Sequence, residues 1–204
     1  MNYTITIGRQ LGSGGKQIGE ALARRLGFSF YDKELILLAS KESGLGKEFF
    51  EKADEKTKFS LFSGFFGSYE GGVFSNNYLC SESLFKIQSD VILELAEKQS
   101  CVFVGRCADY ILRKHPHCLN IFISANEKDR VLRTKNKEHI TESKAKSLIE
   151  YTDKKRAGYY NYYSNKTWGV ASSYDLCVNS SVLGIDGTVE LIMNFFTKKF
   201  GAVS

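Results

Sequence analysis

A glycine-rich segment near the N-terminus has the composition of a phosphate-binding turn. Gly12-Ser13-Gly14-Gly15-Lys16 lies between a β-rich run at residues 3–7 and an amphipathic helical pattern that begins near Lys16. Glycines let the backbone turn so that several N–H groups face one concavity, and the start of a helix adds the positive end of its dipole. Lysine supplies a mobile cation at the edge of the turn. The segment therefore predicts binding of a nucleotide or another phosphate.

The segment departs from the phosphate-loop consensus G-x-x-x-x-G-K-[ST] in both of its alignments. If Gly15-Lys16 is the G-K pair, the first glycine falls at Gln10 and the Mg²⁺-binding hydroxyl at Gln17. In the other alignment Gly12-Ser13-Gly14 forms the bend, Gly15 takes the lysine position, and Lys16 and Arg9 are displaced substitutes. In both alignments the residues of the segment suit phosphate binding better than metal binding. A strand-to-helix turn that binds nothing remains an alternative, since such motifs give false positives.

Length and composition favour a single globular α/β domain, residues 1–204. A chain of this length can bury one sizeable core, and its hydrophobic content of 43% carries no signature of global disorder. The net charge of +5 is spread along the chain, which suits a small anionic ligand. It lacks the clustered basic stripe typical of nucleic-acid binders, so nucleic acid is the less favoured partner.

The cysteine pattern fits a reducing compartment. The five cysteines are odd in number and include no Cys-x-x-Cys pair, which argues against a disulfide framework and a four-thiolate zinc site. His115-Pro116-His117-Cys118 gathers three potential ligands, but the proline and the adjoining strand make tetrahedral geometry awkward, so we expect no metal there. No charged-then-apolar leader opens the chain, and no run approaches the ~20 apolar residues of a membrane span. We therefore expect a cytoplasmic protein without a membrane partner.

Hydrophobic spacing predicts alternating strands and helices. Gly27 is placed to end the first helix, Asp32 can cap the helix that follows, and Asn126 and Thr141 can cap two later ones. Strands are expected at residues 3–7, 28–31, 101–104, 119–123 and 174–178. Helices between these strands imply a mostly parallel, five-stranded sheet that is covered on both faces.

The pattern loosens between residues 42 and 77. A charged piece, 47–58, precedes a piece rich in Phe, Gly and Ser, 59–77. Long irregular segments in compact domains are usually functional or disordered. We favour a flap over a substrate for the second piece, while a partner-binding surface and a packed loop stay open as alternatives.

With these elements placed, the chain resembles the nucleoside monophosphate kinases, and most closely the cytidylate kinases and their cytidylate kinase-like relatives. The resemblance covers nearly the whole chain and rests on several short motifs in order: the glycine-rich segment, Phe30-Tyr31-Asp32, Val104-Gly105-Arg106, Ile121-Phe122-Ile123-Ser124-Ala125 and Asp175-Leu176-Cys177-Val178-Asn179. It implies a three-layer αβα phosphate-loop kinase fold with an acceptor-binding insertion at about residues 32–80 and a lid at about 126–170. It also implies ATP and Mg²⁺ as cofactors and small nucleotides as partners.

The resemblance also assigns roles to single residues. It implies that Arg106 binds the phosphate of the acceptor nucleotide, a role that suits the planar fork of a guanidinium. Arg130 and Arg133 resemble lid arginines that clamp the donor phosphates, and Arg156 and Lys166 can act in the same way. Each could instead be an ordinary solvated charge. The implied catalytic residues are Lys16, Arg106, Arg130 and Arg133; the implied cofactor-binding residues are Arg9, Gly12, Ser13, Gly14, Gly15, Lys16 and Gln17; the implied substrate-binding residues are Asp32, Arg106, Asp109, Arg156 and Lys166.

Three features leave alternatives open. Asp32 could orient substrate or hold a water on Mg²⁺, or it could serve only as a helix cap. The aspartate that the family has directly after Gly-Arg is Cys107 here, with Asp109 two residues further on. The tyrosine-rich segment 159–163, with Trp168-Gly169, could stack on a base or close the core.

The function that the resemblance implies is transfer of the ATP γ-phosphoryl group to a small acceptor, such as the nucleoside monophosphate CMP. The departure at Gln17 motivates a second hypothesis, a non-catalytic nucleotide sensor on a kinase-like scaffold. A nucleic-acid-binding module is the third, and it predicts affinity that falls steeply with salt.

Overall fold

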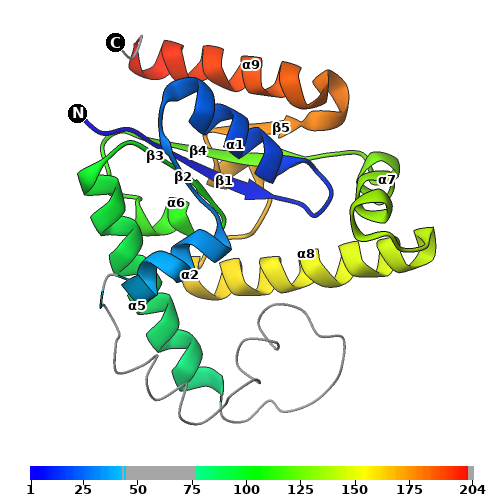
Figure 1. Cartoon of the computed structure of the whole chain (residues 1–204), viewed down its shortest axis with the longest axis horizontal. Coiled ribbons are helices and arrows are strands. Elements are labelled where there is room, and N and C mark those ends of the chain that lie inside the picture. Colours follow the sequence, from blue (N-terminus) through cyan, green and yellow to red (C-terminus); the bar gives the residue numbers. More distant parts are fainter. Residues whose placement is uncertain (43, 45–76, 202–204) are drawn as a thin grey trace.

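The structure, a computed structural model, describes residues 1–42, 44 and 77–201 (Figure 1). The segment expected to form a flap, 59–77, therefore lies outside the described residues except for its last position. None of the described helices is both long and apolar enough to cross a membrane.

Strands and helices alternate along the described chain (Figure 1). The strands are β1 (Thr4–Arg9), β2 (Ser29–Tyr31), β3 (Cys101–Val104), β4 (Cys118–Ser124) and β5 (Leu176–Asn179). The helices are α1 (Gly15–Leu26), α2 (Lys33–Glu42), α5 (Asn77–Lys98), α6 (Ala108–Ile111), α7 (Glu127–Glu138), α8 (Glu142–Ser164) and α9 (Ser180–Phe200), with a 3₁₀ turn at Ala171–Ser173. Each of the five predicted strands is present, and no end differs from its prediction by more than two residues.

The five strands form one parallel sheet in the order β2-β3-β1-β4-β5. β1 is central, with Thr4 opposite Cys101 on one side and Cys118 on the other. β5 begins at Leu176 rather than at Tyr174, because Asp175 binds Asn120 through its backbone N–H and its carboxylate before the ladder starts. The predicted α/β class is confirmed.

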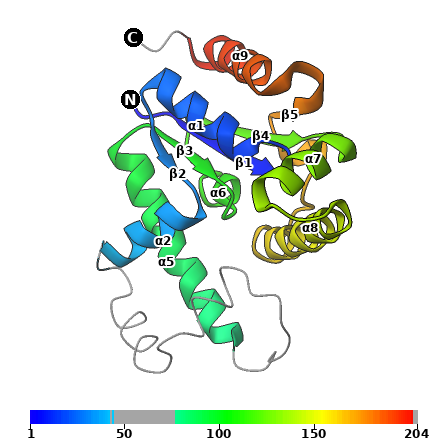
Figure 2. The ribbon, with the colours of Figure 1, turned by 45° about the vertical axis from the view of Figure 1, so that its right-hand side comes forward.

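Helices cover both faces of the sheet, as Figure 2 shows. Side chains alternate along β3: Val102 and Val104 pack with α1 and α9, whereas Cys101 and Phe103 pack with α2, α5 and α6. This alternation divides the core into two layers, one on each face, and gives the three-layer fold.

Local signals placed most helix ends correctly. α1 ends at Gly27, with φ +68, and the carboxylate of Asp32 accepts from the first amides of α2. Thr141 caps α8 through its hydroxyl. The expected cap at Asn126 is wrong in detail, because its side-chain oxygen accepts from the Asn179 amide instead of from α7. α9 begins at Ser180 and kinks at Gly184.

α7 and α8 pack against each other beyond the carboxyl end of β1 (Figure 1). A small apolar cluster joins them, formed by Val131 from α7 with Ala145 and Ile149 from α8, and Leu11 from the glycine-rich loop packs against it. The helix pair is thereby fixed next to the edge of the sheet where parallel α/β folds bind ligands.

Candidate active site

The glycine-rich segment forms a tight turn between β1 and α1, and most of its amides have no hydrogen-bond partner among the described residues. Gly12 has φ +76, and a β-carbon there would lie 2.5 Å from the carbonyl oxygen of Arg130, so only glycine fits between the loop and α7. In the part of the chain that the structure describes, the N–H groups of Gly12, Gly14, Gly15 and Lys16 have no hydrogen-bond partner. Free amides at the start of a 12-residue helix are an arrangement that binds phosphate.

The carbonyl side of the same loop is held by arginines of α7. Arg130 Nε donates to the Leu11 carbonyl at 2.8 Å, and Arg133 Nη1 donates to the Gly12 carbonyl at 3.2 Å. The two arginines that resemble donor-phosphate clamps therefore contact the backbone of the loop in this structure. Their guanidinium groups add positive charge beside the predicted phosphate position.

Lys16 lies at the edge of the loop and pairs with Asp32. Its Nζ lies 2.5 Å from Asp32 Oδ2, and its side chain is 51% exposed, whereas Asp32 is buried. The hydrogen bond that Lys16 donates to Asp32 raises the pKa of Lys16. Burial raises the pKa of Asp32, but the hydrogen bonds from Lys16 and from the backbone outweigh it and lower that pKa below its usual value. Both groups are therefore charged, and Lys16 is the cation that pairs with the buried Asp32 at the edge of the loop.

The residues around the loop do not fit direct coordination of Mg²⁺. Asp32 uses one oxygen for Lys16 and the other for the amides of Glu34 and Leu35, at 3.0 and 3.1 Å. The Ser13 hydroxyl is buried and donates to the Gln10 carbonyl. Gln17, in the position of the usual hydroxyl, is exposed on α1. These oxygens could reach a hydrated Mg²⁺ only through water.

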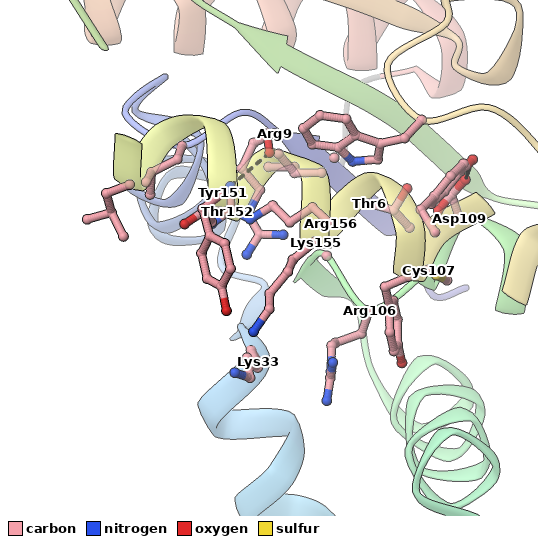
Figure 3. A pocket seen from close by; sticks show the side chains of 18 of the residues that line it. Thr6, Arg9, Lys33, Arg106, Cys107, Asp109, Tyr151, Thr152, Lys155 and Arg156 are labelled. Carbon is pink, nitrogen blue, oxygen red and sulfur yellow. Dashed lines mark hydrogen bonds between the residues drawn. The ribbon is translucent and has the colours of Figure 1, made fainter. Parts of the chain in front are cut away.

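A cavity of about 690 Å³ lies beyond the carboxyl ends of β1 and β3 and is closed on one side by α8. Figure 3 shows the charged ends of Lys33, Arg106, Lys155 and Arg156 facing the same open space between α2 and α8. Besides these and Arg9, two carboxylates, Asp109 and Glu138, line the cavity. Five cations against two acids give the cavity an excess of positive charge, which favours an anionic ligand.

The positive charges in the cavity repel one another and lower the pKa values of Arg9 and Lys33. Burial lowers the pKa of Arg9, and the neighbouring charges of Arg156 and Arg106 lower it further. Burial, followed by the charge of Arg106, lowers the pKa of Lys33 to about 8. A bound anion would relieve this repulsion, because opposite charge stabilises the protonated forms.

The end of β3 brings Arg9 and Arg106 together. Gly105 has φ +85, and a β-carbon there would lie 2.2 Å from Arg9 Nη1, so the guanidinium of Arg9 lies directly over this glycine. Arg106 follows with φ +58, and its Cζ lies 5.0 Å from the ring centre of Tyr159 on α8. The Gly-Arg pair thus places two guanidinium groups at one wall of the cavity.

Asp109 forms the polar end of the cavity. It is buried, and Tyr160 donates to its carboxylate at 2.6 Å. Burial raises the pKa of Asp109, although the bond from Tyr160 and the charge of Lys166 act in the opposite direction. Asp109 therefore lines the cavity together with aromatic side chains, among them Tyr160 and Trp168.

The structure separates the predicted site residues into two groups. Arg9, Arg106, Asp109 and Arg156 line the cavity, whereas the glycine-rich segment with Lys16 and Gln17 lies beside it. Lys166 is exposed after the end of α8 and does not line the cavity.

Sequence reasoning missed three residues that line the cavity. Lys33 is the first residue of α2, at the carboxyl edge of β2. Tyr151 and Lys155 are the other two; they precede Tyr159, which belongs to the predicted tyrosine-rich segment, at intervals of four, so the three share one face of α8. That spacing is a signal that the sequence contains, and it could have marked α8 as a wall of the site.

Solved structures with the same fold were found by comparison of coordinates. An uncharacterized protein from Eubacterium ventriosum ATCC 27560 matches with a TM-score of 0.72 and 26% identity, over 96% of this chain and 98% of that one. Shikimate kinase from Bacteroides thetaiotaomicron matches with a TM-score of 0.53 and 14% identity, over 95% and 97%. TT1252 from Thermus thermophilus matches with a TM-score of 0.56 and 13% identity, over 95% and 97%. The last two similarities concern the fold alone.

Sequence comparison identifies the family. No curated protein matches the chain with significant similarity. The sequence profile of the cytidylate kinase-like family matches residues 4–182, which include both the glycine-rich loop and the basic cavity. The chain is a member of the cytidylate kinase-like family, with the fold of the phosphate-loop kinases.

Proposed function

We propose that this protein is a nucleotide kinase that transfers the γ-phosphoryl group of ATP to a nucleoside monophosphate such as CMP. The observation that carries the proposal is the juxtaposition of two anion sites: unpartnered amides at the start of α1, and five cations around the adjacent cavity. Membership of the family supports a nucleotide as substrate. ATP would supply the donor phosphates, and Mg²⁺ would neutralise part of their charge, with Asp32 and Gln17 reaching it only through water.

In the proposed reaction a phosphate oxygen of the acceptor forms a bond to the γ-phosphorus as the bond to the β,γ-bridging oxygen breaks. The products are ADP and the nucleoside diphosphate. The acceptor oxygen is already ionised, so the step needs no base. Lys16 and the loop amides would hold the donor phosphates, while Arg106, Arg9 and Arg156 would hold the acceptor phosphate. α8 would exclude water from the space between them.

The proposal includes the organisation of the chain. We assign residues 126–170 to the lid and about 32–80 to the acceptor region of a single domain, 1–204. α7 and α8 fall within the proposed lid, and Lys33 falls within the proposed acceptor region. The cysteine pattern supports a reducing cytoplasm as the compartment.

Coupled measurement of ADP formation with ATP, Mg²⁺ and each nucleoside monophosphate tests the proposal. We expect turnover with at least one acceptor and a loss of about 100-fold in kcat/KM for Lys16→Ala and for Arg106→Gln, the usual size for removal of one transition-state cation. Arg113→Gln is the matched control, because Arg113 is exposed outside the cavity and donates to the Tyr110 carbonyl. The proposed kinase activity would be rejected if no acceptor gave turnover and if Lys16→Ala bound ATP as well as wild type does.

One observation favours the second candidate, a non-catalytic nucleotide sensor. Lys16 is already paired with Asp32, and Gln17 replaces the hydroxyl that usually binds Mg²⁺. A sensor would bind ATP with equal affinity with and without Mg²⁺ and would not turn it over. Fluorescence of Trp168, the only tryptophan in the sequence and part of the cavity wall, provides the binding signal for this comparison.

A further inference from the structure

Both backbone groups of Leu11 are held by a single buried ion pair. The Leu11 N–H donates to Asp153 Oδ1 at 2.8 Å, and the Leu11 carbonyl accepts from Arg130 Nε at 2.8 Å. Arg130 Nη2 and Asp153 Oδ2 form the ion pair that closes the ring. Their side chains are only 10% and 15% exposed, so this pair is shielded from water far better than a surface ion pair.

The same turn of α8 holds the loop at a second point. Arg156 lies three residues after Asp153, on the same side of the helix, and its Nη1 donates to the Arg9 carbonyl at 2.9 Å. Gln10, between the two contacts, is fixed to β4 through its backbone N–H and its side chain. The entry to the glycine-rich loop is therefore fixed from both sides.

These contacts set the direction in which the loop amides point. In a trans peptide the carbonyl and the N–H point in opposite directions, so Arg130 on the Leu11 carbonyl turns the Gly12 N–H away from α7. Ser180 Oγ donates to the Ser13 carbonyl at 2.7 Å. The N–H of the same peptide, that of Gly14, therefore points away from Ser180. The two unpartnered amides are thus oriented by side chains that lie outside the loop.

We propose that Asp153 is a positioning residue for the donor nucleotide. It fixes the Leu11 N–H directly and orients Arg130 on the Leu11 carbonyl, and the ring that results prepares the Gly12 amide to receive a phosphate oxygen. Asp153 itself touches neither nucleotide. The inference rests on the proposed function, because it concerns the same donor site.

The test compares Asp153→Asn with wild type and with Glu142→Gln. The asparagine keeps the shape of the side chain but loses the charge that binds Arg130. Glu142 also lies on α8 and forms an exposed ion pair with Lys146, so its substitution controls for a change of charge on this helix. Two quantities are measured for each protein: hydrogen exchange of the backbone at residues 9–15, and the dissociation constant of a non-hydrolysable ATP analogue from Trp168 fluorescence or calorimetry.

We expect Asp153→Asn to raise exchange in the loop and to weaken the ATP analogue by about 10-fold, the size of one charge-assisted hydrogen bond, with the affinity for the acceptor changed less than about twofold. Glu142→Gln should change neither quantity. In the double variant Asp153→Asn with Arg130→Gln, the loss of analogue affinity should be smaller than the sum of the two single losses, because part of the effect of Asp153 passes through Arg130.

Three results would overturn the inference. Unchanged exchange and affinity in Asp153→Asn would remove the positioning role. Raised exchange with unchanged affinity would leave Asp153 a purely structural residue. Failure of the wild-type protein to bind the analogue would reject the proposed function and this role with it, and the wild-type measurement distinguishes that case from the other two.

Discussion

The substitution Gly12→Ala should destabilise the protein far more than the same substitution at Gly27. Both glycines adopt a left-handed conformation, with φ +76 and φ +68, so alanine pays a similar backbone cost of about 1–2 kcal/mol at each. They differ in their surroundings. A β-carbon at Gly12 would lie 2.5 Å from the Arg130 carbonyl oxygen and 2.8 Å from the Arg130 Cα, whereas no atom lies within 4 Å of a β-carbon at Gly27.

The contact at Gly12 is with backbone, so a change of rotamer cannot relieve it. α7 must move away from the loop, which disrupts the bond from Arg130 to the Leu11 carbonyl and from Arg133 to the Gly12 carbonyl. At about 1.5 kcal/mol for each charge-assisted bond, the loss is about 3 kcal/mol beyond the backbone cost. The expected penalty is therefore about 4–5 kcal/mol for Gly12→Ala and about 1–2 kcal/mol for Gly27→Ala.

Urea unfolding of the two variants, followed by circular dichroism, measures the difference directly. The free energies of unfolding should differ by about 3 kcal/mol, with equal m-values if neither variant changes the unfolded state. Only Gly12→Ala should lose affinity for ATP. Equal free energies of unfolding for the two variants would refute the close approach of α7 to the loop, and with it the account of how the loop amides are oriented.

Three further outcomes follow from the cavity and its surroundings. Gly105→Ala should displace the Arg9 guanidinium, which lies 2.2 Å from the new β-carbon, and weaken CMP binding by about 10-fold or more while ATP binding persists; equal losses for both ligands in calorimetry would contradict this. Burial raises the pKa of Asp109, so wild type gains stability at acid pH that is lost as pH rises through that pKa. The melting temperature of wild type relative to Asp109→Asn should therefore fall as pH rises above about 4, and a constant difference would count against the burial of Asp109. Burial also raises the pKa of Cys101 and Cys107 to about 12, so iodoacetamide should modify the exposed Cys177 before these two, as peptide mass mapping can verify; equally fast modification of Cys107 would contradict its burial.

Local sequence was enough to place most of the secondary structure. Gly27 ends α1 and Asp32 begins α2 because the groups that determine these ends lie within four residues of them. The apolar run at Cys101–Val104 predicted a strand buried on both faces, and its alternate side chains do pack into the two separate layers of the core. Asn126 departs from the prediction because Asn179, 53 residues away in sequence, offers its side chain a different partner.

The sequence by itself determined a glycine-rich strand-to-helix turn, an α/β alternation and the family, since each of these depends on residues close together in the chain or on their order. Only the tertiary structure decided which charged groups meet. Arg9, predicted as part of the loop, lies in the cavity with Arg106 and Arg156, and the Leu11 backbone contacts Asp153 from 142 positions further along the chain. No spacing rule connects residues so distant, because their meeting depends on the strand order and on the packing of α8 beyond the end of β1.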